Sequence, residues 1–363
     1  MKDIKITKIE DWGFGFKNPI LVAGPCSAES AEQIDTISKQ LKSSNIDMFR
    51  AGIWKPRTRP GSFEGVGEEG LEWMKIAKEN LGKPVTTEVA NAKHVEQALK
   101  AGIDILWIGA RTTVNPFSVQ EICDALEGVD IPVMVKNPIN PDLQLWIGAI
   151  ERLNNVGITK IAAIHRGFSN KYVTQFRNAP EWSMPLKLKE LIPDISIISD
   201  PSHICGNREM LADISQKALN FGLDGIMVET HNDPDNAWSD AKQQITPETY
   251  NAMINNLVIR NSIDNAPELK TNLEELREKV DVMDRKLIDV LSERFEYIKS
   301  IGKYKRANNL AVFQKDRWKD VTESRVKMGT DRDLSEEFMR SLLSAIHEES
   351  IKQQEEMLEK DND

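Results

Sequence analysis

The sequence predicts an α/β fold, a (β/α)8 barrel, followed by an all-α domain of three helices. From about residue 19 to 260, short β-rich runs alternate with amphipathic stretches of helical length, as in a parallel α/β sheet. From 271 to about 357 the chain is rich in Glu, Lys, Arg and Leu, almost free of Gly and without Pro. A length of 363 residues suits a barrel of roughly 250 residues plus a helical module.

Eight runs are expected to form the strands of the barrel. Each is followed by a plausible helix, and most open toward Gly, Arg, Lys or His, which fits a closed barrel better than a doubly wound sheet. The runs are 19–24, 47–52, 84–89, 104–111, 132–138, 160–167, 196–203 and 225–231.

The domain boundaries follow from the change in composition. We expect a barrel over 1–262, a polar linker over 263–269, a helical domain over 270–358 and a frayed tail over 359–363. Thr271 with Glu274 forms a capping-box pattern that is expected to start the first helix. That helix should be long, because its apolar residues keep an a/d phase: Leu273, Leu276, Val280, Met283, Leu287, Val290 and Ile301.

Composition excludes several classes of function. Asp and Glu number 57 against 47 Lys and Arg, and no basic tract appears, so a nucleic-acid partner is not expected. No run of 18 apolar residues and no export signal is present, which argues against membrane association. Three cysteines without paired spacing indicate a reducing compartment, so we expect a cytoplasmic protein.

Four potential metal ligands lie at or just beyond the ends of predicted strands, where barrel active sites are built. They are Cys26, His203, Glu229 and Asp240. Each alone has an ordinary explanation in core packing or turn formation. Together, one thiolate, one imidazole and two carboxylates suit a borderline divalent metal such as Mn, Fe, Co or Zn.

Six cations form a second set at the same predicted face: Arg50, Lys55, Arg57, Arg111, Lys136 and Arg166. In an acidic protein, such a cluster indicates a multiply charged anion, since arginine binds phosphate and carboxylate in a bidentate manner. An alternative is an aldolase that uses Lys136 as a Schiff-base nucleophile, but the four metal ligands would then have no use.

The motifs that contain these residues resemble those of the type I 3-deoxy-D-arabino-heptulosonate 7-phosphate (DAHP) synthase family. They are GPCSAES (24–30), KPRTRP (55–60), GAR (109–111), VKNP (135–138), HRGF (165–168), DPSH (200–203) and VETH (228–231) followed by SDAKQ. KPRT is the most discriminating, because the related synthase of the eight-carbon sugar acid has an Asn-containing motif there. The chain begins almost directly at the barrel, so no extra N-terminal regulatory domain is expected.

The resemblance implies the condensation of phosphoenolpyruvate with erythrose 4-phosphate, and it implies residue roles. Cys26, His203, Glu229 and Asp240 would bind the metal. Arg57 and Thr58 would bind the phosphate of erythrose 4-phosphate. Phosphoenolpyruvate would be held by Arg50, Lys55, Arg111, Lys136 and Arg166, with Lys55, Lys136 and His165 as the expected catalytic residues.

The helical region also contains charges in unusual positions. Arg294 falls in phase with the apolar seam, where a charge needs an anionic partner. Lys305 lies about three turns further along nearly the same face, and Ser350 and Gln354 are one turn apart. Considered alone, Lys305 or Arg277 would be interpreted as an ordinary solvent-exposed residue of a charged helix.

Together with LREKVDVMDRKLIDVLSER (276–294), GKYK (302–305), QKDR (314–317) and EESIKQQ (348–354), this pattern resembles the all-helical chorismate mutase family. The resemblance implies that Arg277 and Arg294 bind the two carboxylates, Arg277 in the partner protomer's site. It implies that Lys305 and Gln354 face the ether oxygen and that Arg317 and Ser350 complete the pocket.

Two positions depart from the family: Trp318 replaces a frequent Glu, and Gln314 a frequent Asp. An alternative is therefore a non-catalytic module that dimerises and senses chorismate or prephenate. A scaffold protein would leave the convergent charges unexplained.

We also expect a homodimer through the helical domain, because its first helix has more apolar seam than a module of about 90 residues can cover. In addition, we expect the ligand of the helical domain to inhibit the barrel by feedback.

Overall fold

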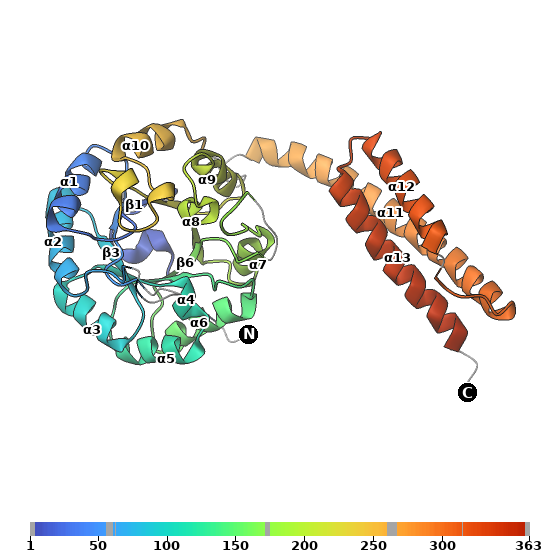
Figure 1. Ribbon diagram of the computed structural model, residues 1–363, viewed down its shortest axis with the longest axis horizontal. Helices are drawn as coiled ribbons and strands as arrows, with labels where there is room; N and C mark the ends of the chain where they lie inside the picture. Colours follow the sequence, from blue (N-terminus) through green and yellow to red (C-terminus); the bar gives the residue numbers. More distant parts are fainter. Residues whose placement is uncertain are drawn as a thin grey trace. The chain divides into compact units, whose positions relative to one another are not determined.

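The computed structural model of the protein describes residues 4–55, 61, 63–170, 175–259, 267–313 and 315–359. The chain divides into two compact units, Met1–Asn261 and Ser262–Asp363. In the first, parallel strands are hydrogen-bonded in the order β1 to β8, and β8 pairs with β1 to close a barrel, with helices around it (Figure 1). The predicted barrel is confirmed, and each of the eight predicted runs contains one of its strands.

The strands of the barrel are β1 (Ile20–Gly24), β2 (Met48–Arg50), β3 (Val85–Val89), β4 (Ile105–Ile108), β5 (Val133–Lys136), β6 (Ile161–His165), β7 (Ser196–Ser199) and β8 (Gly225–Glu229). The helices of this unit are η1 (Ile9–Trp12), α1 (Ala31–Leu41), α2 (Glu69–Leu81), α3 (Ala92–Ala101), α4 (Ala110–Thr113), α5 (Pro116–Ala125), α6 (Leu143–Asn155), α7 (Ser183–Leu191), α8 (Pro201–Cys205), α9 (Leu211–Asn220), η2 (Pro234–Asn236), η3 (Ala241–Gln243) and α10 (Pro247–Asn256).

Capping residues in the sequence fix where several of these helices begin. The side chains of Ser30, Asn91, Asp142 and Thr246 each accept a hydrogen bond from the backbone N–H three residues further on. Such bonds satisfy donors that the first turn of a helix leaves free. The loops that follow the strands therefore have defined ends.

The barrel interior is filled by alternate residues of the strands, because successive side chains of a strand point to opposite faces. Its buried apolar cluster includes Val22, Met48, Trp107, Met134, Ile164, Ile198 and Met227 from the strands. Ile9, Trp12 and Phe16 from the N-terminal segment join the same cluster. The other residues of each strand pack outward against the helices in a second, larger core.

The second unit consists of α11 (Pro267–Ala307), α12 (Lys315–Thr330) and α13 (Glu336–Glu359). The helix α13 packs against both α11 and α12. A small core forms from Val326, Met339 and Leu343, with Trp318 packed against it. The expected three-helix domain and its long first helix are confirmed, but α11 begins at Pro267, inside the range expected for the linker and four residues before Thr271. Proline suits the first turn of a helix, since its missing N–H has no intrahelical partner there.

The apolar seam of α11 is largely exposed within a single chain. Leu276, Val280, Met283, Leu287 and Val290 each keep more than half of their surface accessible. Neither α12 nor α13 covers this face in the described part of the unit. Among the described residues, no helix is long and apolar enough to span a membrane.

Candidate active sites

Four charged side chains form the last inward-facing layer of the barrel. Arg50, Lys136 and Glu229 each end a strand, and Asp200 directly follows β7. Each lies two residues after an apolar residue of the interior cluster, so strand alternation turns all four inward. The carboxyl ends of parallel strands share one end of a barrel, and this layer therefore forms the floor of its mouth.

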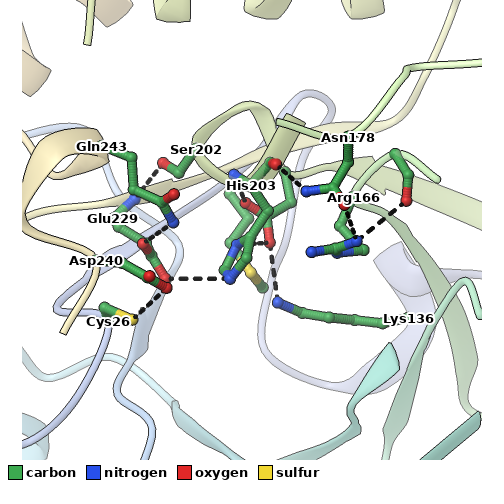
Figure 2. Close-up of polar contacts among 12 residues, drawn as sticks. Cys26, Lys136, Arg166, Asn178, Ser202, His203, Glu229, Asp240 and Gln243 are labelled. Carbon is green, nitrogen blue, oxygen red and sulfur yellow. Dashed lines mark hydrogen bonds and ion pairs between the residues drawn. The ribbon is translucent and has the colours of Figure 1, made fainter. Parts of the chain in front are cut away.

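Three predicted metal ligands come together at this mouth. One donor atom each of Cys26, Glu229 and Asp240 lies within 4.8 Å of the others, and Figure 2 shows the three side chains side by side. Gly24 permits the close approach of β1 to β2, because a Cβ there would lie 2.0 Å from the carbonyl oxygen of Arg50. Asp240 adopts a left-handed backbone conformation with φ of 49°. A thiol and two carboxylates in one cluster fit a borderline divalent cation.

The fourth predicted ligand, His203, lies at the edge of this cluster. Its Nε2 is 3.8 Å from Glu229 Oε1 (Figure 2). Its Nδ1 is 2.8 Å from Asp200 Oδ2. Metal-binding histidines commonly place a carboxylate on their second nitrogen, which fixes the ring and leaves the first nitrogen for the metal. Burial lowers the pKa of His203, and a neutral imidazole is the form that binds a cation.

Cys26 is fully buried and contacts Lys55. Burial, with the nearby charge of Glu229, raises the pKa of the Cys26 thiol to about 12. Lys55 Nζ lies 2.9 Å from both the sulfur and the carbonyl oxygen of Cys26. A thiol with this pKa keeps its proton at neutral pH unless a bound cation displaces it.

The cations of the floor are already paired with carboxylates. Arg50 Nη1 lies 3.2 Å from Glu229 Oε1, and Lys136 Nζ lies 2.9 Å from Asp200 Oδ2. Both cations also lie over the ring of Trp107, at 4.9 and 5.6 Å from its centroid. These contacts compensate the desolvation that buried charges suffer and hold both side chains in place.

Arg166 differs from these two cations. It is buried, and its Nη1 donates to the neutral amide oxygen of Asn178 at 2.7 Å rather than to a carboxylate (Figure 2). Burial lowers the pKa of Arg166 to about 10, so the guanidinium stays charged at neutral pH. A buried cation held by a neutral group retains its charge for an anionic ligand.

The remaining cations predicted for this mouth occupy different settings. Arg111 lies in α4, directly after β4, and is exposed. Arg57 and Thr58 lie outside the described residues. The part of the predicted anion site that the structure describes is therefore formed by Arg50, Lys55, Lys136 and Arg166, with Arg111 at its rim.

His165, expected to be catalytic, does not point into the mouth. Ala162 and Ile164 face the barrel interior, so His165 faces the surrounding helices. Its ring packs against Trp182 and Phe168, and its Nε2 donates to the carbonyl oxygen of Pro180 at 2.6 Å. This placement gives no support to the expected catalytic role, which stays a prediction; the contacts that the structure shows for His165 are packing contacts and one hydrogen bond.

The helical unit brings three predicted residues together and buries a fourth, Lys305. Arg294 Nη1 donates to Ser350 Oγ at 2.9 Å, and Gln354 Nε2 donates to the Ser350 carbonyl oxygen at 3.1 Å. Lys305, Ser350 and Gln354 are buried, although most of the apolar seam of α11 is exposed. Lys305 Nζ donates to the carbonyl oxygen of Val312 at 2.6 Å, and burial lowers its pKa.

Gly302 permits this arrangement, because a Cβ there would lie 3.2 Å from Gln354 Cα on α13. The Oε1 atom of Gln354 is buried and accepts no hydrogen bond within the described unit. A buried acceptor without a donor is costly. The amide oxygen of Gln354 is thus available to a ligand, while its Nε2 is bound to Ser350.

The other predicted residues of this unit lie apart from that group. Arg277 is exposed and contacts Glu274 on its own helix at 2.5 Å, and Arg317 is exposed on α12. Trp318, which replaces a frequent Glu, stacks on His347 with ring centroids 3.6 Å apart. Gln314 lies outside the described residues.

The sequence did not single out several residues that hold this site. Asp200 orients His203, and Asn178 binds both Arg166 and the carbonyl oxygen of His203. Arg177 donates to Asp240 Oδ1 at 3.0 Å. Asp200 was within reach of sequence reasoning, because it follows β7 in the motif DPSH; the loop residues Arg177 and Asn178 carry no such signal.

Comparisons with known proteins identify both units. Residues 3–260 match the DAHP synthetase I family, and residues 276–355 match chorismate mutase type II. The phospho-2-dehydro-3-deoxyheptonate aldolase of Thermotoga maritima is 32% identical over 235 residues, covering 64% of this chain and 67% of that protein. A 2-dehydro-3-deoxyphosphooctonate aldolase of Desulfotalea psychrophila is 28% identical over 261 residues, covering 66% and 88%.

The fold comparison agrees with the sequence comparison. A crystal structure of the Thermotoga maritima phospho-2-dehydro-3-deoxyheptonate aldolase (DAHP synthase) superimposes with a TM-score of 0.61 at 28% identity. The match covers 70% of this chain and 75% of that one. The similarity thus spans most of the barrel in both sequence and structure.

The placement of His165 predicts a test by pH. Burial lowers the pKa of His165 from 6.5 to about 4, so the folded protein binds fewer protons than the unfolded chain between these values. Its contribution to stability is present above pH 6.5 and is lost as the pH falls toward 4. His165→Gln keeps a donor for Pro180 and should therefore show a shallower loss of unfolding free energy over this window, measured by urea denaturation.

The activity of the barrel should fall less than about tenfold in His165→Gln, because loss of a general acid or base typically costs 10²- to 10⁴-fold. A folded variant that loses about 10²-fold or more would restore the catalytic role.

Proposed function

Because the chain belongs to the DAHP synthetase I family and has a chorismate mutase type II segment after the barrel, we propose that it catalyses two reactions of aromatic biosynthesis. The barrel condenses phosphoenolpyruvate with D-erythrose 4-phosphate to DAHP and phosphate. The helical unit rearranges chorismate to prephenate. The observation that carries the first assignment is the convergence of Cys26, Glu229 and Asp240 beside a layer of buried cations.

A divalent metal would be held by Cys26, Glu229 and Asp240, with His203 as a fourth ligand oriented by Asp200. Such an ion would act as a Lewis acid on the aldehyde oxygen of erythrose 4-phosphate. The donor set suits Mn, Fe, Co or Zn. The family match supports metal dependence but does not select among these ions.

The cations at the mouth of the barrel would bind and orient phosphoenolpyruvate. Arg166 and Lys55 are not bound to carboxylates by any described hydrogen bond, so their charge is available to the phosphate and carboxylate. Lys136 and Arg50 are fixed by Asp200 and Glu229, which favours a preorganised position for the enolpyruvate carbon that attacks the aldehyde. Arg111 would contribute from the rim.

The choice of aldehyde rests on KPRT, in which Arg57 and Thr58 would bind the phosphate of erythrose 4-phosphate. This motif favours the four-carbon sugar over the substrate of the eight-carbon synthases that the chain also resembles. A Schiff base on Lys136 is disfavoured, because its ammonium is buried in an ion pair with Asp200.

Removal of the metal should separate the two activities. We expect a chelator to abolish loss of phosphoenolpyruvate with erythrose 4-phosphate and to spare loss of chorismate. Cys26→Ala should lower the first activity by at least about 10²-fold, since loss of outer-shell partners alone typically costs 10- to 100-fold. The matched control is Cys123→Ala, a buried cysteine of α5 outside the cluster, which should keep both activities. Full synthase turnover in chelated, metal-free enzyme would refute the metal assignment.

The helical unit would act as a cationic cage. The rearrangement of chorismate needs no nucleophile, so preorganised donors facing the breaking C–O bond are sufficient. Lys305 and Gln354 offer a buried ammonium and a buried amide, and Arg294 with Ser350 would bind a carboxylate. Arg317 would complete the pocket when chorismate binds.

Lys305 provides the sharpest test of this cage. Lys305→Ala should lower mutase turnover by about 10²- to 10³-fold and affect binding less, because the ammonium would stabilise charge that develops only in the transition state. Lys303→Ala, two residues away and exposed on the same helix, is the matched control and should leave the rate unchanged. An unchanged rate in Lys305→Ala would favour a binding module without turnover.

That alternative has one observation in its favour. Trp318 stacks on His347 where the family often has a glutamate for the substrate hydroxyl, so this contact to the substrate would be absent or replaced. The burial of Lys305 and Gln354 favours turnover, since a lysine is costly to bury without a function.

We further propose that the chain forms a homodimer through α11. Its exposed seam would be covered by the same seam of a second chain, as closed two-fold symmetry requires, and Arg277 would then reach the partner's pocket.

A charge on the seam should prevent this association. Leu287→Glu is expected to shift the full-length protein toward monomer in sedimentation equilibrium, because the glutamate would be buried unpaired. Lys286→Glu, an exposed neighbour, should remain dimeric. A dimer in Leu287→Glu would instead locate the interface on the barrel.

Finally, we propose that prephenate or chorismate bound to the helical unit inhibits the barrel. Inhibition requires that the ligand bind one state of the protein more tightly than another, and a coupling of about 1–3 kcal/mol would be typical. The coupling is reciprocal for binding, so barrel substrates would change ligand affinity at the helical site.

Titration of prephenate into the synthase assay tests this coupling in the full chain. We expect inhibition of the wild type and none, at equal concentration, of Arg294→Ala, which loses the contact to Ser350. Arg340→Ala, an exposed arginine paired with Glu336 on α13, is the control and should remain inhibited. Equal inhibition of Arg294→Ala would place the ligand in the anion site of the barrel.

A further inference from the structure

Two consecutive glutamines, Gln243 and Gln244, follow the metal-ligand candidate Asp240 in the loop after β8. Gln243 ends η3, and both side chains are buried, at 1% and 0% exposure. A buried primary amide is costly unless its donor and acceptor are both satisfied. The partners of these two amides are therefore defined by the structure.

Gln243 connects two of the candidate ligands. Its Nε2 donates to Glu229 Oε2 at 2.7 Å (Figure 2). Its Oε1 accepts from Arg177 Nη1 at 2.7 Å. The same Nη1 of Arg177 donates to Asp240 Oδ1 at 3.0 Å. A continuous chain of hydrogen bonds thus runs from Glu229 through Gln243 and Arg177 to Asp240.

Gln244 connects the third candidate ligand to the same loop. Its Oε1 accepts from the backbone N–H of Cys26 at 2.9 Å, and its Nε2 donates to the carbonyl oxygen of Ser239 at 2.8 Å. Ser239 precedes Asp240 in the chain, and its hydroxyl lies 2.5 Å from that of Ser27. The segment with Cys26 and the segment with Asp240 are thereby held at a fixed separation.

These contacts counter a specific physical difficulty. Cys26 follows β1, Glu229 ends β8 and Asp240 lies in a loop, so no single element fixes their mutual positions. Two carboxylates within the same cluster also repel each other when no cation lies between them. Donors aimed at both carboxylates reduce this repulsion and orient the ligand oxygens before a cation enters.

We propose that Gln243 and Gln244 are positioning residues that align Glu229, Asp240 and Cys26 for the divalent cation. The proposal rests on the metal site of the proposed function. It assigns no contact with substrate to either glutamine, and it predicts that their loss weakens cation binding more than it weakens the fold.

The test is a titration of the full-length, metal-free protein with Co²⁺, followed by the thiolate-to-cobalt absorption that reports the bond to Cys26. Gln243→Met and Gln244→Met remove the amides at similar length. We expect each to bind Co²⁺ about 10- to 100-fold more weakly than the wild type, the range typical of outer-shell partners.

Gln33→Met is the matched control. Gln33 is also buried, and its amide makes two hydrogen bonds to the loop after β1, to Ser27 O at 3.2 Å and from Glu29 N at 3.0 Å. None of these partners is a candidate ligand. The Co²⁺ affinity of Gln33→Met should equal that of the wild type.

Thermal unfolding with and without Co²⁺ separates positioning from a structural role. A positioning role predicts that the rise in melting temperature on adding Co²⁺ is smaller in Gln243→Met than in the wild type, because stabilisation follows the affinity for the ligand. Wild-type Co²⁺ affinity with an equal loss of melting temperature in both conditions would overturn the proposal.

If Gln243→Met does not fold, Gln243→Glu replaces it. This variant keeps an acceptor for Arg177 and turns a second carboxylate toward Glu229, so it should also weaken Co²⁺ binding; wild-type affinity would again overturn the proposal. Failure of the wild type itself to give the cobalt–thiolate absorption would overturn the metal site together with this inference. Wild-type absorption together with unchanged Co²⁺ affinity in both variants would overturn the inference alone.

Discussion

Charge compensation at the mouth of the barrel is the constraint on which the rest of the site depends. The closure of the barrel buries four charged side chains, Arg50, Lys136, Asp200 and Glu229, at or next to the ends of their strands. Arg50 pairs with Glu229 and Lys136 with Asp200, with Trp107 beneath both cations. Because these pairs neutralise each other's charge, further groups are needed for binding: Cys26 and Asp240 would join Glu229 around a cation. Arg166 and Lys55 would join Arg50 and Lys136 around an anion.

The helical unit differs from the barrel, because a single chain buries little of its apolar surface. Its core of Val326, Met339 and Leu343 is small, and α11 leaves its apolar seam exposed. Its most enclosed polar groups belong to the proposed cage, where Gly302 permits α11 and α13 to approach closely at Gln354. The proposed association with a second chain would stabilise such a unit and would connect assembly to the formation of a complete pocket.

The strands and the strand-end residues were predictable, because hydrophobic alternation is a local signal and a barrel gathers strand ends at one face. The outward orientation of His165 was also predictable, since neighbours on a strand face opposite sides and Arg166 was expected at the mouth. The helix was expected to start at Thr271, but the same capping pattern can also occur inside a helix, and α11 starts earlier, at Pro267. The contacts of Gln243, Arg177 and Asn178 were beyond sequence reasoning, since their partners come from loops distant along the chain.

X-ray absorption at the metal edge of the full-length protein loaded with Zn²⁺ tests the central claim most directly, because it reports the ligand atoms without any assay of turnover. The account predicts one sulfur ligand at about 2.3 Å, from Cys26, together with nitrogen and oxygen ligands at about 2.0–2.2 Å. A spectrum with oxygen and nitrogen ligands alone would contradict it.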